Sequence, residues 1–306
     1  MANINDVSRL AQVSKATVSR VLSGSRGVKE ESRLAVMRAV EVLNYKPNVI
    51  AQSLSNQSTG CIGVVCASEN INQATGYLHA LEKQLRLHQK HLLLRFATDA
   101  ANVIDALNEI GNGLCDAVIV IGARFPLPAL PHSAVTIDCL ESHTVRSIQF
   151  DHAFAAQTAS QYLINQGRRK IALITQHDGE AAEQTAQGYH QALEHHLLPY
   201  NRQLVFGGEN ALQRLLNQNV SFNGLLVPDD ALAQEALRLL SQFGRQVPAD
   251  VMVFSLDSTL PQGASPIPAM SYPLDKLAQR AIALLTMPLS TDPGLVPIRG
   301  TLVTPF

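Results

Sequence analysis

The 306-residue chain has no tryptophan, four cysteines and no apolar run approaching the ~20 residues that span a bilayer. Its first residues, MANINDV, lack the basic and apolar segments of a secretory leader. The cysteines form no CxxC pair and have no histidine at ligand spacing, which indicates free thiols in a reducing compartment. We therefore expect a cytoplasmic protein with no membrane association, disulfide or metal site.

Sequence motifs of the common enzyme classes are also missing. The chain contains no GxSxG, GxxxxGK, HExxH or GxGxxG pattern. Isolated histidines such as His177 are more often ordinary surface or core residues than catalysts. We expect no catalytic residue, no cofactor and no enzymatic activity.

Charge is distributed unevenly along the chain although the formal net charge is only −1. Residues 1–60 hold eight Lys or Arg against four acidic residues, whereas the remainder holds 16 basic and 21 acidic residues. Such a split is typical of a small head that binds a polyanion and is attached to a neutral or acidic body. A surplus of this size also arises by chance, so charge alone does not decide the function.

The sequence of the head predicts three short helices. Asn3 is a good N-cap with Asp6 in the first turn, and Ser14 can cap a second helix. The third helix has apolar residues at helical spacing: Val36, Ala39, Val40 and Leu43. Three helices of this size, with a tight turn between the first pair, indicate a helix-turn-helix unit.

The second helix, within SKATVSRVLSG, has an unusually small and hydroxyl-rich outer face. The apolar stripe of Val18, Val21 and Leu22 leaves five residues pointing outward: Lys15, Ala16, Thr17, Ser19 and Arg20. A helix in the major groove needs small residues near the backbone of the DNA and long basic residues that reach guanine. A plain amphipathic helix in a small bundle remains the alternative.

Residues 44–59, NYKPNVIAQSLSNQST, predict a hinge helix that starts at Pro47 and ends in a polar linker. A helix this short is unstable alone in water, so it is expected to fold when it meets a partner. Leu54 could wedge between base pairs in a minor groove.

From Cys61 onward, apolar runs alternate with amphipathic helical stretches, which favours parallel sheets covered by helices in two α/β halves. The expected strands are CIGVVCA, HLLLRFA, AVIVIGA, AVTID, KIALIT, QLVFGG, GLLVPD and VMVFSLD. The expected helices are residues 77–87, 103–110, 153–165, 181–195, 211–216 and 231–243. We divide the chain into a DNA-binding head at 1–46, a hinge at 47–60 and a body at 61–306.

Polar side chains follow several of the predicted strands. Ser68, Asp151, Asp229 and Asp257 each come after an apolar run. Ligands of open α/β sheets bind beyond the carboxyl ends of strands, where carboxylates can accept hydrogen bonds from hydroxyls or amines. Capping of the following helices is an equally good interpretation for any one of these aspartates.

Two motifs at the right separation carry a family resemblance: DVSRLAQVSKATVSRVLSG, and NYKPNVIAQSL before a body that starts with IGVV. They resemble the LacI/GalR family of bacterial transcription regulators. The resemblance implies a helix-turn-helix head with a hinge helix and a two-lobed body like the periplasmic sugar-binding proteins. It places Lys15, Ala16 and Arg20 at bases, Ser14, Thr17 and Ser32 at phosphates, and Ala51 and Leu54 in the hinge at the operator centre.

In the body, the resemblance places Asp229 and Asp257 in the ligand cleft and Asp151 near it, and Tyr272 joins the expected effector contacts. One departure concerns Thr185, three residues before Gly188, where relatives commonly have an arginine that grips sugar hydroxyls or a carboxylate. The missing tryptophan removes a stacking partner often used for sugars. The pair Asp229-Asp230 favours a ligand with donors or positive charge.

Together these features predict a sequence-specific DNA-binding transcriptional regulator, expected to be a repressor. It would act as a homodimer or tetramer on near-palindromic operator DNA, and a small polar effector, sugar-like or a related metabolite, would modulate its affinity. The alternative is a soluble sugar-binding module without a DNA function, which leaves the head unexplained.

Overall fold

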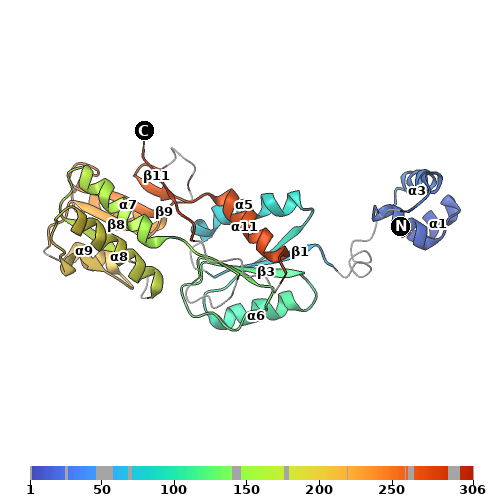
Figure 1. Ribbon diagram of the computed structural model, residues 1–306, viewed down its shortest axis with the longest axis horizontal. Helices are drawn as coiled ribbons and strands as arrows, with labels where there is room; N and C mark the ends of the chain where they lie inside the picture. The colour runs from blue at the N-terminus through green and yellow to red at the C-terminus, as the bar shows by residue number, and fades with distance from the viewer. Residues whose placement is uncertain are drawn as a thin grey trace. The chain divides into compact units, whose positions relative to one another are not determined.

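The chain folds into two compact units, Met1–Thr59 and Gly60–Phe306, in the computed structural model (Figure 1). We treat each unit by itself. The described residues are 2–24, 27–45, 58–67, 71–139, 146–175, 179–218, 220–258, 260, 265–288 and 297–305.

The first unit is a bundle of three helices: α1 (Ile4–Ala11), α2 (Lys15–Leu22) and α3 (Glu30–Val42). Each helix contributes one fully buried valine to the core, namely Val7, Val18 and Val36. Burying three such side chains stabilises the head by about 5 kcal/mol before the entropy of folding is counted, so the core is small.

Both predicted caps of the head are confirmed. The amides of Asn5 and Asp6 donate to Asn3 Oδ1 (2.8 and 3.3 Å), and the Asn3 amide donates back to Asp6 Oδ2 (3.0 Å). The Thr17 amide donates to Ser14 Oγ (3.1 Å), which fixes the start of α2. These bonds satisfy amide groups that the first turn of a helix leaves without a backbone partner.

The second unit, the body, contains two sheets, and we call the part around each sheet a lobe. The N-terminal lobe has the parallel sheet order β2-β1-β3-β4-β5. Its strands are β1 (Cys61–Cys66), β2 (His91–Phe96), β3 (Ala117–Ile121), β4 (Val135–Ile137) and β5 (Ser147–Ile148). Its helices are α5 (Ile71–Leu87), α6 (Ala100–Gly111) and α11 (Leu274–Thr286).

The C-terminal lobe has the sheet order β11-β10-β9-β8-β6-β7, parallel except for β11. Its strands are β6 (Ile171–Ile174), β7 (Val205–Phe206), β8 (Gly224–Val227), β9 (Met252–Ser258), β10 (Ala269–Ser271) and β11 (Thr301–Val303). Its helices are α7 (His152–Asn165), α8 (Glu180–His195), α9 (Ala211–Asn217) and α10 (Asp230–Gln242), with the short turn η1 (Arg202–Leu204).

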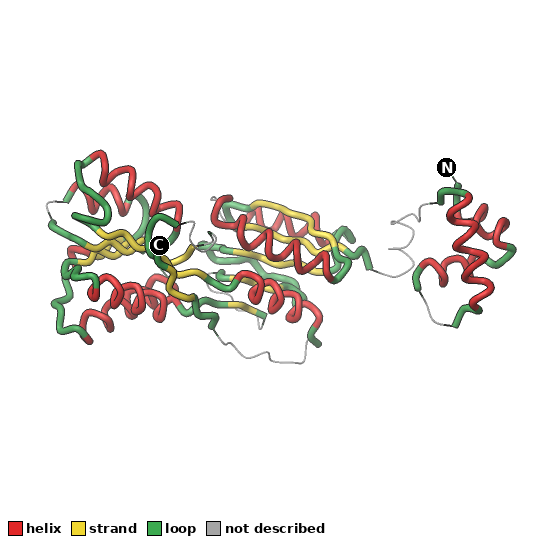
Figure 2. Tube along the Cα trace, turned by 90° about the horizontal axis from the view of Figure 1, so that it is seen from above, coloured by secondary structure: helices red, strands yellow, loops and turns green. Residues whose placement is uncertain are grey.

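Helices cover both faces of each sheet (Figure 2), so central strands are buried on both sides. This explains why β6 and β8 read as continuous apolar runs and not as alternating patterns. The predicted fold class, an all-α head and a two-lobed α/β body, is confirmed, and each predicted strand overlaps an observed one. The strands β5, β10 and β11 were not among the predicted strands, and α5 begins at Ile71 and not at Tyr77.

The chain passes between the lobes at residues 149–151, 272–273 and 297–300, and aromatic packing joins these crossings. The rings of Phe150 and Tyr272 stack with centroids 4.1 Å apart at 16°. Phe150 also forms a β-bridge with Ile298. The crossings are therefore packed against one another between the lobes.

Gly188 in α8 provides a test of helix packing in the body. A Cβ at this position would lie 2.0 Å from the Ala153 carbonyl oxygen of α7, whereas a Cβ at Gly111 would meet nothing within 4 Å. We expect Gly188→Ala to lower the free energy of unfolding by about 2 kcal/mol or more, because two backbones must separate. Gly111→Ala, the control, should leave it unchanged or raise it slightly. Urea denaturation followed by circular dichroism checks both, and equal stability of the two variants would contradict the packing.

Candidate functional site

The outer face of α2 has the properties predicted for a DNA-reading surface. Lys15, Ala16 and Arg20 are exposed, whereas Val18 and Val21 are buried against the other two helices. No acidic residue lies within α2. The face therefore presents two long cations around a small residue, as close approach to a base edge requires.

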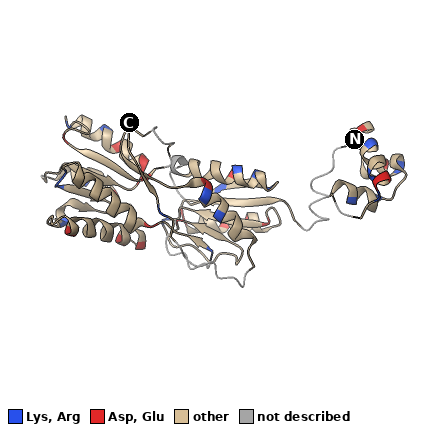
Figure 3. Ribbon diagram, turned by 45° about the horizontal axis from the view of Figure 1, so that its top comes forward, with Lys and Arg blue, Asp and Glu red and all other residues tan. Residues whose placement is uncertain are grey.

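The predicted phosphate contacts of the head are three hydroxyl residues, Ser14, Thr17 and Ser32. Ser14 and Thr17 are in contact through their hydroxyls (2.9 Å), and Ser32 is half-buried in the first turn of α3. Each of the three head helices contains Lys or Arg residues, which are coloured blue on the ribbon in Figure 3. The predicted hinge residues Ala51 and Leu54, and the predicted effector contact Ser68, lie outside the described residues.

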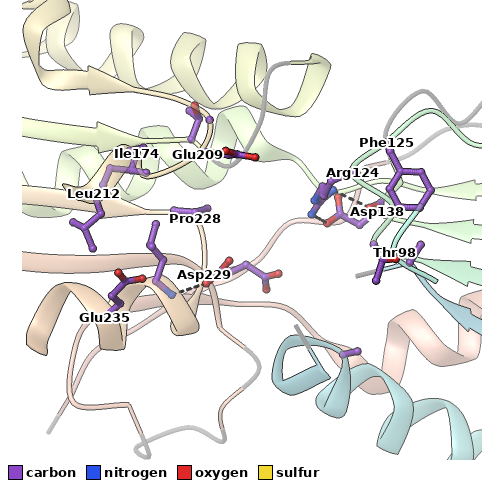
Figure 4. A pocket seen from close by; sticks show the side chains of 18 of the residues that line it. Thr98, Arg124, Phe125, Asp138, Ile174, Glu209, Leu212, Pro228, Asp229 and Glu235 are labelled. Atoms are coloured by element: carbon purple, nitrogen blue, oxygen red, sulfur yellow. Dashed lines mark hydrogen bonds and ion pairs between the residues drawn. The ribbon is translucent and has the colours of Figure 1, made fainter. Parts of the chain in front are cut away.

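A cavity of about 700 Å³ lies between the lobes of the body (Figure 4). It is bordered by residues that end or follow six parallel strands: Ala67 after β1, Ile121 of β3, Asp138 after β4, Thr175 after β6, Pro228 after β8 and Asp257 of β9. Side chains of α5, α9 and α10 complete the walls. The cavity thus occupies the position that the strand-end pattern predicted.

Two of the predicted effector residues, Asp229 and Asp257, line the cavity. Asp229 also caps α10, because the Leu232 amide donates to its Oδ1 (2.8 Å). Asp229 therefore both lines the cavity and caps the following helix, as the two interpretations of its position after a strand predicted. Asp257 accepts a hydrogen bond from the Tyr77 hydroxyl at 3.3–3.4 Å, which joins β9 of the C-terminal lobe to α5 of the N-terminal lobe.

The other predicted effector residues lie elsewhere. Asp151 caps α7 through the Phe154 amide (2.9 Å) and pairs with Arg299 (2.8 Å). Thr185 is buried and its hydroxyl donates to the Ala181 carbonyl (2.7 Å), so it does not line the cavity. Tyr272 is buried, and its hydroxyl has no hydrogen-bond partner in the described part of the chain.

The N-terminal lobe contributes an ion pair that the sequence reading did not identify. Arg124 follows β3 and Asp138 follows β4, and the Arg124 guanidinium donates to Asp138 Oδ2 (2.5 Å) and to the Asp138 carbonyl (2.9 Å). His152 Nε2 lies 3.0 Å from Asp138 Oδ1. Asp138 has a positive φ of 49°, a conformation that Asp tolerates better than most residues. Asp138 directly follows the apolar run AVTI, so the same strand-end pattern could have identified it as a cavity residue.

Asp138 and Asp257 are both buried at the cavity, but their pKa values shift in opposite directions. Burial favours the neutral form of Asp138, but the charge of Arg124, with His152, outweighs burial and holds the pKa of Asp138 well below its usual range. Burial, followed by repulsion from Asp138, raises the pKa of Asp257 to about 8 despite the opposing effect of Arg124. At neutral pH, the Asp257 carboxyl is therefore mostly protonated and can donate a hydrogen bond.

Two sequence families match separate parts of the chain. Residues 3–48 match the family described as bacterial regulatory proteins, lacI family, and residues 160–303 match a periplasmic binding protein-like domain. The transcriptional regulator GalR of Escherichia coli K12 is 30% identical over 303 residues, covering 93% of this chain and 88% of GalR. The chain belongs to the LacI family of bacterial regulatory proteins. It is a DNA-binding transcriptional regulator.

Solved structures share the fold of this LacI-family chain. A lac repressor dimer bound to operator and the anti-inducer ONPF aligns with a TM-score of 0.81 at 20% identity, covering 99% of this chain and 98% of that one. A complex of the regulator CelR with cellobiose aligns with a TM-score of 0.65 at 22% identity, covering 99% of both chains. The ribose operon repressor of Haemophilus influenzae is 29% identical over 84% of this chain and 82% of its own.

The described residues contain neither a metal-binding group nor a membrane-spanning helix. No group of three or more His, Cys, Asp or Glu within them could hold a metal ion. None of the helices described is long and apolar enough to cross a bilayer.

The Arg124–Asp138 pair of this LacI-family regulator predicts strong coupling between two substitutions. Arg124→Met should lower the free energy of unfolding by about 3 kcal/mol, because it leaves a buried carboxylate without its main counter-charge. Adding Asp138→Asn should restore all but about 1 kcal/mol, since no buried charge then remains. Urea denaturation of the two single variants and the double variant gives the coupling energy. Additive losses would show that the pair does not stabilise the fold.

Asp257 predicts a pH dependence of stability. Its folded pKa of about 8 exceeds the unfolded value of 3.8, so unfolding releases a proton between these two pH values. The stabilisation that the protonated Asp257 carboxyl gives the folded state is complete below pH 3.8 and is lost as the pH rises through about 8. The lowered pKa of Asp138 acts in the opposite sense, below pH 3.8. We expect the free energy of unfolding of the wild type, relative to that of Asp257→Asn, to decrease as the pH rises from 3.8 to about 8. Urea denaturation at a series of pH values measures this difference. A constant difference would contradict the raised pKa.

Proposed function

We propose that this chain represses transcription as a homodimer or tetramer that binds a near-palindromic operator through α2 of each head. A small polar effector in the cavity between the lobes would change the affinity for the operator. The combination of an exposed Lys15-Ala16-Arg20 face with a lined cavity in the same chain carries the proposal. The presence of the ribose operon repressor among the relatives supports repression.

In this proposal, Lys15, Ala16 and Arg20 read bases and Ser14, Thr17 and Ser32 contact phosphates. The exposure of the first three residues supports this division, since phosphate contacts position a protein and base contacts give specificity. The predicted hinge contacts Ala51 and Leu54 belong to the same proposal. The proposed parts are the head at 1–46, the hinge at 47–60 and the body at 61–306.

Effector contacts are proposed at Asp229 and Asp257, which line the cavity. Asp151, Thr185 and Tyr272 do not line it and, like Ser68, stay predictions. The buried Tyr272 hydroxyl without a described partner supports a role near the ligand, since such a group favours a polar contact. Burial, with repulsion from Asp257 and Asp138, raises the pKa of Tyr272, consistent with its proximity to these carboxyls. The protein would act by binding alone, in the cytoplasm, without catalysis or a cofactor.

Effector and operator affinities would be coupled through the relative position of the lobes. The Tyr77–Asp257 hydrogen bond spans both lobes beside the cavity, so a ligand that replaces or strengthens it favours one arrangement over the other. Any such ligand must alter operator affinity by the same factor by which the operator alters ligand affinity. A sugar-binding module without a DNA function would leave the exposed face of α2 without a role.

Arg20→Ala tests the DNA-binding face. After selection of bound DNA from a random pool, we expect this variant to lose about 10-fold to 100-fold in affinity for each base contact removed. The control is Arg238→Ala, which removes the same charge from an exposed position of α10 in the body and should bind normally. Gel shifts over a salt series measure both. Equal affinity of the two variants, or no preferred site in the selection, would reject the proposal.

A further inference from the structure

Two of the four cysteines are in contact at the start of the first strand of the body. Cys61 is the first residue of β1, and Cys115 lies two residues before β3, which pairs with β1 in parallel. The Cys115 thiol donates to Cys61 Sγ, with the two sulfurs 3.3 Å apart. Two thiols in contact need only a small rotation of their side chains to reach disulfide bonding distance.

These two thiols differ in exposure from the other cysteines of the chain. Cys61 and Cys115 are half-buried, so a small molecule can reach the pair from solvent. Cys66 and Cys139 are only 1% and 7% exposed. Burial raises the pKa of each of these last two thiols to about 11, so they remain protonated at neutral pH. Thiol chemistry in this chain is therefore confined to the Cys61–Cys115 pair.

The hydrogen bond between the sulfurs assigns different roles to the two thiols. Burial, together with donation to Cys61, raises the pKa of Cys115 to about 12, so Cys115 retains its proton. The attacking species in thiol–disulfide exchange is a thiolate. The first attack on an oxidant therefore falls to Cys61, and Cys115 is in place to attack the Cys61 sulfur afterwards.

The pair is connected to the residue at which the chain from the head enters the body, Gly60. The Asp116 amide donates to the Cys61 carbonyl (2.8 Å), and the Gly60 amide donates to Asp116 Oδ2 (3.1 Å). Lys90 Nζ pairs with the same carboxylate oxygen (2.9 Å). Asp116 therefore holds Gly60 in place, and a movement of the neighbouring sulfurs acts on this contact.

We propose that Cys61 and Cys115 form a reversible disulfide with a low-molecular-weight disulfide as oxidant, and that this bond lowers the affinity for the operator. Cys61 gives its proton to water and attacks one sulfur of the oxidant, which forms a mixed disulfide and releases a thiolate. That thiolate takes the Cys115 proton, and Cys115 attacks Cys61 Sγ. The second thiolate leaves and takes a proton from water. The protein thus loses two electrons and two protons, and the oxidant becomes two thiols.

The lower operator affinity follows from the position of the disulfide in the chain. Residues 47–60, the proposed hinge, are predicted to fold when they meet a partner, and they end at Gly60 beside the pair. Because the disulfide displaces Gly60 from its contact with Asp116, the arrangement that binds DNA becomes less favourable. This effect rests on the proposed function, whereas formation of the disulfide does not. Transient, redox-sensing disulfides also occur in reducing compartments.

Oxidised glutathione tests the disulfide on the full chain at neutral pH. In the treated wild type, peptide mass spectrometry should map a disulfide to Cys61 and Cys115, and two of the four thiols should remain titratable after denaturation. Cys115→Ser should stop at a glutathione adduct on Cys61. Cys61→Ser should stay unmodified, because Cys115 retains its proton. Cys66→Ala removes a thiol outside the pair and is the control, which should form the disulfide like the wild type.

Gel shifts with the selected operator measure the effect on DNA binding. Oxidation should lower the affinity of the wild type and of Cys66→Ala by about fivefold or more, as is usual for coupling between two sites. Dithiothreitol should restore the affinity, and Cys61→Ser should not respond to the oxidant.

The wild type carries the decisive measurements, so the inference can be tested even if a serine variant does not fold. Failure of the Cys61–Cys115 disulfide to form would overturn the inference, and so would an oxidised wild type with unchanged operator affinity. If the reduced wild type binds no operator, the proposed function fails, and the mass spectrum still decides whether the disulfide forms.

Discussion

The parallel arrangement of the strands is the constraint on which the cavity depends. In each lobe, successive parallel strands end at the same edge of the sheet, so residues far apart in the sequence meet there. Asp138, Asp229 and Asp257 follow or end β4, β8 and β9, and all three line one cavity. Tyr77 reaches the same cavity from α5 and bonds to Asp257. The site therefore belongs to both lobes, and a ligand there contacts both at once.

The carboxyl groups on the two sides of this cavity have different partners. In the N-terminal lobe, the Arg124 guanidinium and the Asp138 carboxylate form a short pair that holds the pKa of Asp138 low. In the C-terminal lobe, the Leu232 amide donates to Asp229 and the Gln213 side chain donates to Glu235. One carboxyl, Asp257, retains its proton, since burial and neighbouring carboxylates both disfavour its charged form.

The head follows different physical rules because its core is small. A few buried valines and two well-formed helix starts specify three short helices. The surface of α2 is then free to meet the requirements of DNA recognition, with exposed Lys15 and Arg20 on either side of small residues. Stability and recognition thus use different faces of the same eight-residue helix.

The local features of this protein could be predicted from its amino-acid sequence. The caps at Asn3 and Ser14, the buried strands and the fold class all follow from short-range chemistry and periodicity, and the family follows from two motifs of the head. The sequence also placed Asp229 and Asp257 correctly at the cavity, because strand ends can be read locally. Which polar groups meet depends on the packing of the folded chain. That packing turned Thr185 toward Ala181, assigned Asp151 to Arg299, and brought Arg124 into the wall against Asp138. These pairings join residues from different strands, helices and loops, and they depend on packing that no local pattern records.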